Sequence, residues 1–393
     1  MNYKWNLNES NFTYFDRLKI CKFFLNPKNR WTQGNFVLNY ENTWSKRVGS
    51  NHAICVNSGS SANTLIAQFA AENNPSNKNT VVFPSVTWQT SVSPWINLGF
   101  NPKFIDVNLN DFSMDLKKLD NYLKDNYKKV NTVFITSLIG VTPDILTAKQ
   151  ICNSYNVTLK LDNCENIFGS YSGKHVCSEL TSSTSLYFGH QTTTGSEGGI
   201  IFTNSDDEMV SYVLNRSHGL TRELLNYDLG KKYYKKITND EVNEQFDFNT
   251  LGSNFRMSNI AAFMGSLDFE KLDTYIKSRK QLYKVYSDLI SNDFILPKEY
   301  NSRENVMFCL PIILKDKCHK KMNKIKHLLR NLEIEYRPII SGNLLRQTCY
   351  KKYENYKDFK NAEHLHNYGV YVGLHPKLKQ RQIYLLTRKL NIL

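Results

Sequence analysis

Short apolar segments alternate with helix-like segments through the first half of the chain, and this alternation constrains the fold most strongly. Strands are predicted at residues 53–56, 80–84, 103–107, 132–137 and 157–162, and helices at residues 64–71, 116–123 and 148–156. Near-continuous apolar strands are typical of a parallel sheet that is buried on both faces. The order of elements therefore predicts an α/β fold, with a large, mostly parallel sheet covered by helices on both sides.

The pattern changes in the last third of the chain. A long helix is predicted over about residues 270–290 and a strand over residues 306–314, followed by shorter mixed segments. We therefore expect a large domain over residues 1–265, which begins with a helical segment. A smaller α+β domain is expected over residues 266–393.

Composition excludes several classes of protein. The 393 residues are 41% hydrophobic and 22% charged, as in globular proteins. The net charge of +14 is dispersed, without a basic stripe interleaved with aromatic residues, so no nucleic-acid partner is expected. The charge is interpreted as solvated surface, or as an attraction for a small anion such as a nucleotide diphosphate. No apolar run approaches a membrane span and no signal peptide is visible, so we expect a cytoplasmic protein without a membrane partner.

The eight cysteines are scattered, and none forms a CxxC or CxC pair. Compact cysteine spacing is the usual signature of zinc ribbons and of iron–sulfur clusters. The sequence therefore predicts neither a metal site nor an iron–sulfur cluster.

Small polar residues and a histidine follow the predicted strands at their carboxyl ends. The loop 57–63 joins a strand to a helix, which makes it either an anion site or an ordinary capped helix. Trp88 and Asp162 follow two other strands, and residues 185–190 are predicted to begin as a strand and to lead into a Gly-rich turn. Ligands of open α/β sheets bind at this edge, so the convergence predicts a functional site.

Four motifs together resemble the sugar aminotransferase (DegT/DnrJ-type) family. They are Asn57-Ser-Gly-Ser-Ser-Ala-Asn63, Asp162-x-x-Glu165, the 185–190 segment with Glu197-Gly-Gly199, and Asn254-Phe-Arg-Met257. They occur in family order, and the resemblance covers about residues 25–385. It implies the fold type I architecture of aspartate aminotransferase and a pyridoxal 5'-phosphate (PLP) cofactor.

The family's catalytic lysine normally precedes the Glu-Gly-Gly turn by a few residues, and this chain has His190 there. The substitution resembles the histidine-bearing 3-dehydratase branch, and the absent cysteine pattern favours its members without an iron–sulfur cluster. One extra residue before Glu197 leaves a second register open, in which Gln191 would take the lysine position. Counting from Ser185 favours His190. The chemistry favours it too, because of these two residues only histidine can transfer protons near neutral pH.

The resemblance implies roles for several residues. His190 is the expected catalytic residue. Asp162 would pair with the pyridine nitrogen, and Trp88 would stack on the ring unless it packs in the core. Glu165 is either a second-layer group that orders Asp162 or a surface carboxylate. The implied cofactor-binding set is Gly59, Ser60, Trp88, Asp162, Glu165, Ser185 and Asn254, and the candidate substrate-binding residues are His218, Arg222, Asn343 and Arg346.

In the family, an asparagine from the neighbouring subunit reaches the phosphate, so Asn254 implies a homodimer with shared active sites. The implied reaction removes the C3 hydroxyl of a nucleotide-linked 4-keto-6-deoxy sugar. Pyridoxamine 5'-phosphate (PMP) would be the working form of the cofactor, and glutamate would regenerate it as amino donor. The alternatives are an aminotransferase that uses Lys160 or Lys174, and a scaffold protein that has lost its lysine.

Overall fold

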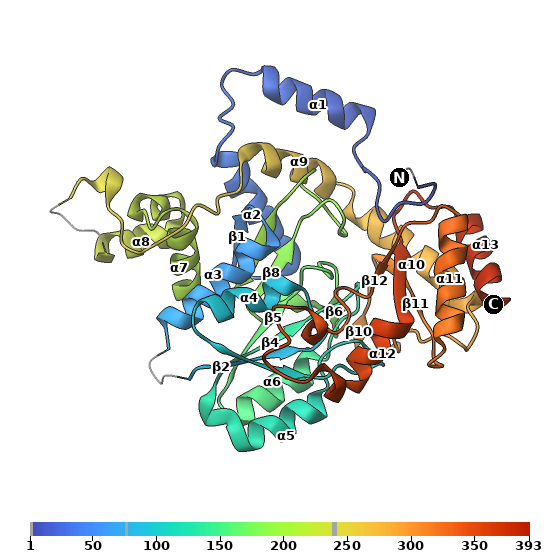
Figure 1. The fold of residues 1–393 in the computed structure, drawn as a ribbon. Coiled ribbons are helices and arrows are strands. Elements are labelled where there is room, and N and C mark those ends of the chain that lie inside the picture. Colours follow the sequence, from blue (N-terminus) through green and yellow to red (C-terminus); the bar gives the residue numbers. More distant parts are fainter. Residues whose placement is uncertain (1–2, 75–77, 238–241) are drawn as a thin grey trace.

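A seven-stranded sheet forms the centre of the computed structural model, which describes residues 3–74, 78–237 and 242–393 (Figure 1). Its spatial order is β1-β9-β8-β5-β4-β2-β3. The strands are β1 (His52–Val56), β2 (Thr80–Pro84), β3 (Asn101–Ile105), β4 (Val130–Thr136), β5 (Thr158–Asp162), β8 (Ser182–Ser185) and β9 (Gly199–Thr203). Only β9 runs against its neighbours β1 and β8, so the predicted mostly parallel sheet is confirmed.

Helices cover both faces of this sheet. They are α2 (Asn35–Val48), α3 (Gly59–Glu72), α4 (Gln89–Asn97), α5 (Leu116–Asn126), α6 (Ile145–Ser154), α7 (Asp206–Arg216) and α9 (Asn259–Phe269). Successive strand residues belong to different buried clusters. Ile54 belongs to a cluster that includes residues of α3, α4 and α7. Its neighbour Cys55 belongs to a second cluster that includes residues of α2, α5, α6 and α9. This alternation is the period-2 pattern of a strand buried on both faces.

The C-terminal part forms a second, antiparallel sheet of order β11-β13-β12. Its strands are β11 (Cys309–Ile313), β12 (Tyr336–Pro338) and β13 (Gly369–Gly373), and its helices are α10 (Leu272–Leu289), α11 (His319–Asn331), α12 (Lys360–Tyr368) and α13 (Gln380–Asn391). A smaller α+β unit is thus present, and α10 leads into it as predicted. The division between residues 265 and 266 stays a prediction.

Peripheral elements complete the described chain. Helix α1 (Tyr14–Leu25) stands off the body at the top of Figure 1, and α8 (Asp228–Ile237) lies at its left edge. A small sheet joins β6 (Ser170–Tyr171), β7 (Lys174–His175) and β10 (Arg303–Glu304). Within the described ranges, no helix has the length and apolarity needed to cross a membrane.

The prediction that a strand begins at residue 185 is wrong. Strand β8 ends at Ser185, and the chain then turns, with the amide of His190 donating to the carbonyl of Tyr187 at 3.0 Å. The amide of Phe188 donates to the carbonyl of Ser196 at 3.1 Å, which closes the loop on itself. The aromatic side chains that suggested a strand belong to this turn.

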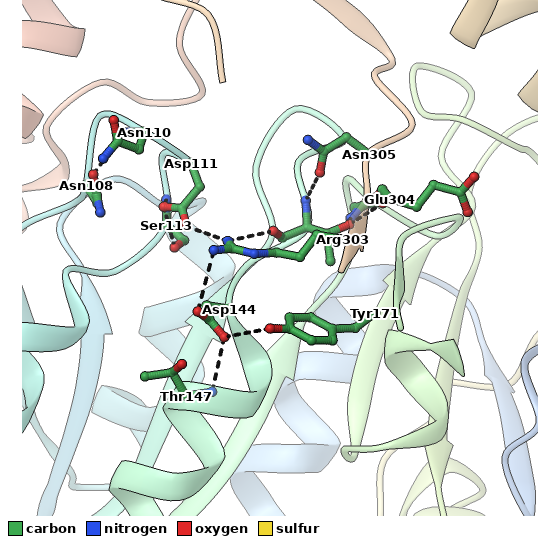
Figure 2. Close-up of polar contacts among 12 residues, drawn as sticks. Asn108, Asn110, Asp111, Ser113, Asp144, Thr147, Tyr171, Arg303, Glu304 and Asn305 are labelled. Atoms are coloured by element: carbon green, nitrogen blue, oxygen red, sulfur yellow. Dashed lines mark hydrogen bonds and ion pairs between the residues drawn. The ribbon is translucent and has the colours of Figure 1, made fainter. Parts of the chain in front are cut away.

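Arg303 fastens the start of the C-terminal part to the large sheet (Figure 2). Its Nη1 donates to Asp111 at 2.7 Å, and its Nη2 lies 3.5 Å from Asp144. The backbone amide of Thr142 donates to Asn305 at 2.8 Å, and its hydroxyl donates to the carbonyl of Glu304 at 2.6 Å. The segment that leads to β11 is therefore bound directly to the loops after β3 and β4.

Candidate active site

A cleft of about 930 Å³ lies between the carboxyl ends of the central strands and the smaller sheet. It gathers seven residues that the sequence proposed for one site from segments far apart in the chain. These are Gly59, Ser60, Trp88, Asp162, Glu165, Ser185 and His190. The convergence predicted at the edge of the sheet is therefore present.

The N-terminus of α3 opens into this cleft. Ser58 caps the helix, because its hydroxyl accepts from the amide of Ser61 at 3.0 Å. Its neighbour Gly59 has no room for a side chain, since a Cβ would lie 2.8 Å from Cys164 Sγ and 2.9 Å from Ser185 Cβ. This segment thus forms the capped N-terminus of a helix and also lines a hollow with amide and hydroxyl groups. Such a hollow suits the binding of a phosphate.

Asp162 ends β5 and is 2% exposed. Its Oδ2 accepts from Asn63 Nδ2 at 2.9 Å and from Ser91 Oγ at 2.5 Å. Its Oδ1 accepts from the amide of Cys164 at 3.1 Å. These bonds fix the carboxylate at the floor of the cleft, where it can stabilise a positive charge on a bound ring. The sequence reasoning missed Asn63 and Ser91, although both are polar residues on otherwise apolar helix faces.

His190 lies in the turn after β8 and lines the cleft. Burial lowers the pKa of its imidazole to about 4, against an opposing effect of Asp162, so the ring is neutral at physiological pH. Its Nδ1 is buried and has no hydrogen-bond partner among the described residues. The rings of Tyr187 and Phe308 pack against it, with centroids 5.5 Å and 5.9 Å away. A neutral imidazole held in an aromatic setting can accept a proton.

The residue of the alternative register, Gln191, does not face the cleft. Gln191 is 1% exposed, does not line the cleft, and donates to the backbone carbonyl of Val306. His190 therefore occupies the position open to a ligand. Neither candidate lysine reaches the cleft, because Lys160 is buried against Glu208 and Lys174 pairs with Glu179 at the surface. In the described part of the chain, no lysine lines this cleft.

The sequence left two alternatives open for each of Glu165 and Trp88, and their positions in the structure bear on both. Glu165 lines the cleft and accepts from the amide of Ile139 at 2.8 Å, so its interpretation as a simple surface carboxylate is wrong. Burial raises the pKa of Glu165 to about 8, against the lowering effect of the hydrogen bond from Ile139, and the charge of Asp162 adds to the rise. Trp88 is 56% exposed at the start of α4, which excludes core packing and leaves its ring available to a ligand.

Asn254 and His218 lie together outside this cleft. Asn254 is exposed, forms an isolated bridge with Ser217, and accepts from Arg256 Nε at 3.1 Å. Arg256 also approaches His218 Nε2 at 3.2 Å. The guanidinium of Arg222 lies over the ring of Phe246, 5.1 Å from its centroid. The roles proposed for Asn254, His218 and Arg222 stay predictions.

Asn343 and Arg346 also lie outside the cleft. Asn343 is buried and donates to Glu363 at 2.9 Å and to the carbonyl of Tyr356 at 3.0 Å. Arg346 makes two bonds to the same carboxylate, at 2.8 Å and 2.6 Å. Their polar groups are occupied by the protein itself, and a substrate-binding role for them stays a prediction without geometric support.

The opposite wall of the cleft was not predicted. It is built by Asn6–Asn8 from the start of the chain and by Glu335, Arg337 and Tyr371 from the smaller sheet. Arg337 Nη2 donates to Glu335 Oε1 at 2.7 Å. Arg337 is the only lysine or arginine among the described lining residues. Asn6–Asn8, Glu335 and Tyr371 lie in no motif of the sequence, and the fold brings them to the site. Arg337 begins a segment, residues 337–347, that resembles the dehydratase branch, but it was not proposed as a site residue.

The residues present fit the phosphorylated pyridine cofactor that the resemblance implies. A helix N-terminus with the side-chain-free Gly59 offers a phosphate cradle. A buried carboxylate, Asp162, lies on the floor, and an exposed indole, Trp88, lies beside it. The unpartnered Nδ1 of His190 indicates that the polar groups of this cleft are not all satisfied by the protein.

Comparison with known proteins gives consistent matches. The model of the DegT/DnrJ/EryC1/StrS aminotransferase family matches residues 24–390. GDP-4-keto-6-deoxy-D-mannose 3-dehydratase of Escherichia coli is 30% identical over 360 residues, covering 88% of this chain and 89% of the relative. GDP-perosamine synthase of Caulobacter vibrioides is 25% identical over 309 residues, covering 78% of this chain and 76% of the relative. A solved GDP-4-keto-6-deoxymannose-3-dehydratase with a trapped PLP-glutamate geminal diamine has a TM-score of 0.88 at 25% identity, covering 98% of this chain and all of that one.

Proposed function

Because the chain belongs to the DegT/DnrJ/EryC1/StrS aminotransferase family, we propose that it is a PLP/PMP-dependent sugar 3-dehydratase. The substrate would be a nucleotide-linked 4-keto-6-deoxy sugar, from which the enzyme removes the C3 hydroxyl. One observation carries the proposal: His190 lines the cleft, and no lysine of the described chain does. Without a lysine amine in reach, the cofactor has to be held by non-covalent contacts.

Each residue of the cleft floor has a defined task in this proposal. The bound cofactor supplies an amine for the sugar ketone and a conjugated ring that accepts electrons. Gly59, Ser60 and Ser185 hold its phosphate at the start of α3. Asp162 stabilises the protonated ring nitrogen through its negative charge, and three hydrogen bonds hold this buried carboxylate in place. The exposed ring of Trp88 offers a stacking surface.

His190 moves the proton. Its imidazole, with the pKa lowered to about 4, is neutral and ready to take a proton from the carbon that bears the cofactor's amine. Once protonated, the same ring is a strong acid in a buried site. It can therefore deliver the proton to the departing C3 hydroxyl oxygen, which leaves as water.

The overall change is balanced with glutamate as the second substrate. Sugar and glutamate give the 3-deoxy-4-keto sugar, 2-oxoglutarate and ammonia. The similarity to a GDP-sugar dehydratase supports GDP as the nucleotide, and the glutamate adduct in its solved relative supports this donor. Since Asn254 lies outside its own cleft and is exposed, we include in the proposal a homodimer that places it at the second active site.

The proposal is tested by supplying the purified protein with PLP, glutamate and a panel of GDP-, CDP-, dTDP- and UDP-linked 4-keto-6-deoxy sugars. Proton NMR of the products should show a new C3 methylene with the GDP-sugar, together with free ammonia. Products that keep the C3 hydroxyl with every nucleotide would refute the dehydratase proposal.

The second candidate is an aminotransferase, favoured by the similarity to GDP-perosamine synthase. Such an enzyme needs a lysine that bonds covalently to PLP. Borohydride reduction of the PLP-loaded protein, followed by peptide mass mapping, separates the candidates. A reduced adduct on Lys160, Lys174 or another lysine would favour the aminotransferase, whereas release of intact PLP favours the dehydratase.

A further inference from the structure

The start of the chain forms a strap, residues Trp5–Asn8, that runs from the smaller sheet into the cleft. Trp5 anchors it, being 3% exposed, with its Nε1 donating to the carbonyl of Gly373 at 2.9 Å. The amide of Glu335 donates to the carbonyl of Trp5 at 2.9 Å, and Trp5 pairs with Ile334 in an isolated bridge. The strap is therefore bound to the segment that leads into β12 through backbone groups, and to the end of β13 through a buried indole.

The strap then passes tightly over β13. A Cβ on Gly373 would lie 2.3 Å from the carbonyl oxygen of Leu7 and 2.5 Å from that of Asn6, so the contact requires glycine. The amide of Leu7 donates to Glu335 Oε2 at 3.0 Å. This anchoring brings Asn6, Leu7 and Asn8 to the wall of the cleft.

Asn8 ends the strap at the turn that carries His190. Its side-chain Nδ2 donates to the backbone carbonyl of Phe188, two residues before the histidine. Its Oδ1 is buried and has no hydrogen-bond partner within the described residues. The bond to Phe188 is therefore what holds the Asn8 side chain in this part of the structure. The strap thus connects the smaller sheet to the turn after β8.

The His190 ring itself is weakly fixed. Its Nδ1 lacks a described partner, and its ring is held by aromatic packing and by the turn bond from its own amide to Tyr187. Its orientation therefore depends on how the turn is held. The family model begins at residue 24, so residues 5–8 lie outside the region that the family comparison describes.

From these contacts we infer that Asn8 is a positioning residue for His190, anchored by the strap. The inference rests on the proposed function in so far as His190 moves the proton. Loss of the Asn8 amide releases the carbonyl of Phe188 and lets the turn change its conformation. Because a displacement of about 1 Å can cost up to roughly a hundredfold in rate, Asn8→Ala should lower kcat about 10- to 100-fold.

The kinetic test is a double-mutant cycle with Asn8→Ala and His190→Asn. If Asn8 acts through His190, Asn8→Ala lowers kcat in the parent and has little further effect in the His190→Asn background. Equal effects in both backgrounds would overturn the inference. Asn29→Ala is the matched control, because Asn29 Nδ2 also donates to a phenylalanine carbonyl, that of Phe23 at 2.8 Å, far from the cleft.

A second readout does not depend on any reaction. In protein labelled with carbon-13 histidine, the His190 ring signal is assigned by its absence in His190→Asn. Asn8→Ala and Asn8→Asp should shift or broaden this signal, since neither side chain can donate to Phe188, whereas Asn29→Ala should leave it in place. An unchanged His190 signal in both Asn8 variants would refute the positioning role, even if the protein proves to be an aminotransferase.

Discussion

The two walls of the cleft are built in different ways. The floor, formed by residues 58–60, Asp162, Ser185 and His190, comes from the carboxyl ends of β1, β5 and β8 in one sheet. The rim, formed by the strap with Glu335, Arg337 and Tyr371, comes from the start and the last fifth of the chain. The Asp162 carboxylate in the floor is buried and held by three donors, whereas Arg337 in the rim is half exposed and pairs with Glu335.

This difference suggests a division of labour. Fixed, buried groups in the floor act where charge changes during the reaction, because burial strengthens their electrostatic effect. The half-exposed charge of Arg337 in the rim is screened by solvent, so it contributes to substrate binding more than to chemistry. Substitutions in the floor should therefore lower kcat or cofactor affinity, and substitutions of the charged rim residues should change KM. Asn8 differs from these charges, because it acts on kcat through the turn that carries His190.

The largest effect is expected for His190→Asn. The variant keeps a polar side chain of similar size and loses the group that moves the proton, so kcat should fall by about 10²- to 10⁴-fold. Cofactor binding, followed by PLP absorbance, should persist. His52→Asn, at a surface histidine paired with Asp206, is the control and should retain full activity. A His190→Asn enzyme with parental kcat would place the proton transfer elsewhere.

Asp162→Asn should act next, through the cofactor. The change removes the charge that stabilises the protonated ring nitrogen, and charge-assisted bonds contribute about 1.5–3 kcal/mol each. PLP affinity, measured by equilibrium titration, should weaken roughly 10- to 100-fold. Parental affinity and activity in this variant would contradict the role of the floor carboxylate.

Glu165 gives a pH-dependent test of the floor. Its pKa is raised by burial to about 8, above its ordinary value of 4.5. Between these values the folded protein holds a proton that the unfolded chain has released, so this group's contribution to stability falls as the pH rises from about 4.5 to about 8.

Glu165→Gln keeps an acceptor for the amide of Ile139 and cannot ionise. Chemical denaturation of cofactor-free protein across this pH range should therefore show a smaller loss of stability towards alkaline pH in the variant than in the parent. Parallel pH profiles for the two proteins would show that Glu165 is ionised at neutral pH in the folded state.

The smallest effect is expected for Arg337, the charged residue of the rim. Arg337→Met removes the one lysine or arginine that lines the described cleft, and both proposed substrates are anions. KM should rise a few-fold while kcat stays near the parental value, since an exposed charge pair contributes only about 0–1 kcal/mol. A large fall in kcat would break the division between floor and rim.

Sequence reasoning reached Asp162 and the loop before α3 because each follows a strand that can be recognised locally. Ser185 and His190 came from the family resemblance instead, since the strand predicted to begin at Ser185 is wrong and β8 ends there. Most of the rim could not be found in this way, since Asn8, Glu335 and Tyr371 lie in no local pattern and reach the cleft only through the fold. For Asn343 and Arg346 the sequence shows two polar side chains but not their partner, and in the structure both bind Glu363.

In the proposed reaction, the cofactor's amino group is lost as ammonia and does not stay on the sugar. Turnover with nitrogen-15-labelled glutamate, PLP and a GDP-4-keto-6-deoxy sugar tests it directly by NMR of the reaction mixture. The label should appear as free ammonium, in proportion to the 3-deoxy sugar formed. Label bonded to C4 of the sugar, with the C3 hydroxyl retained, would contradict it.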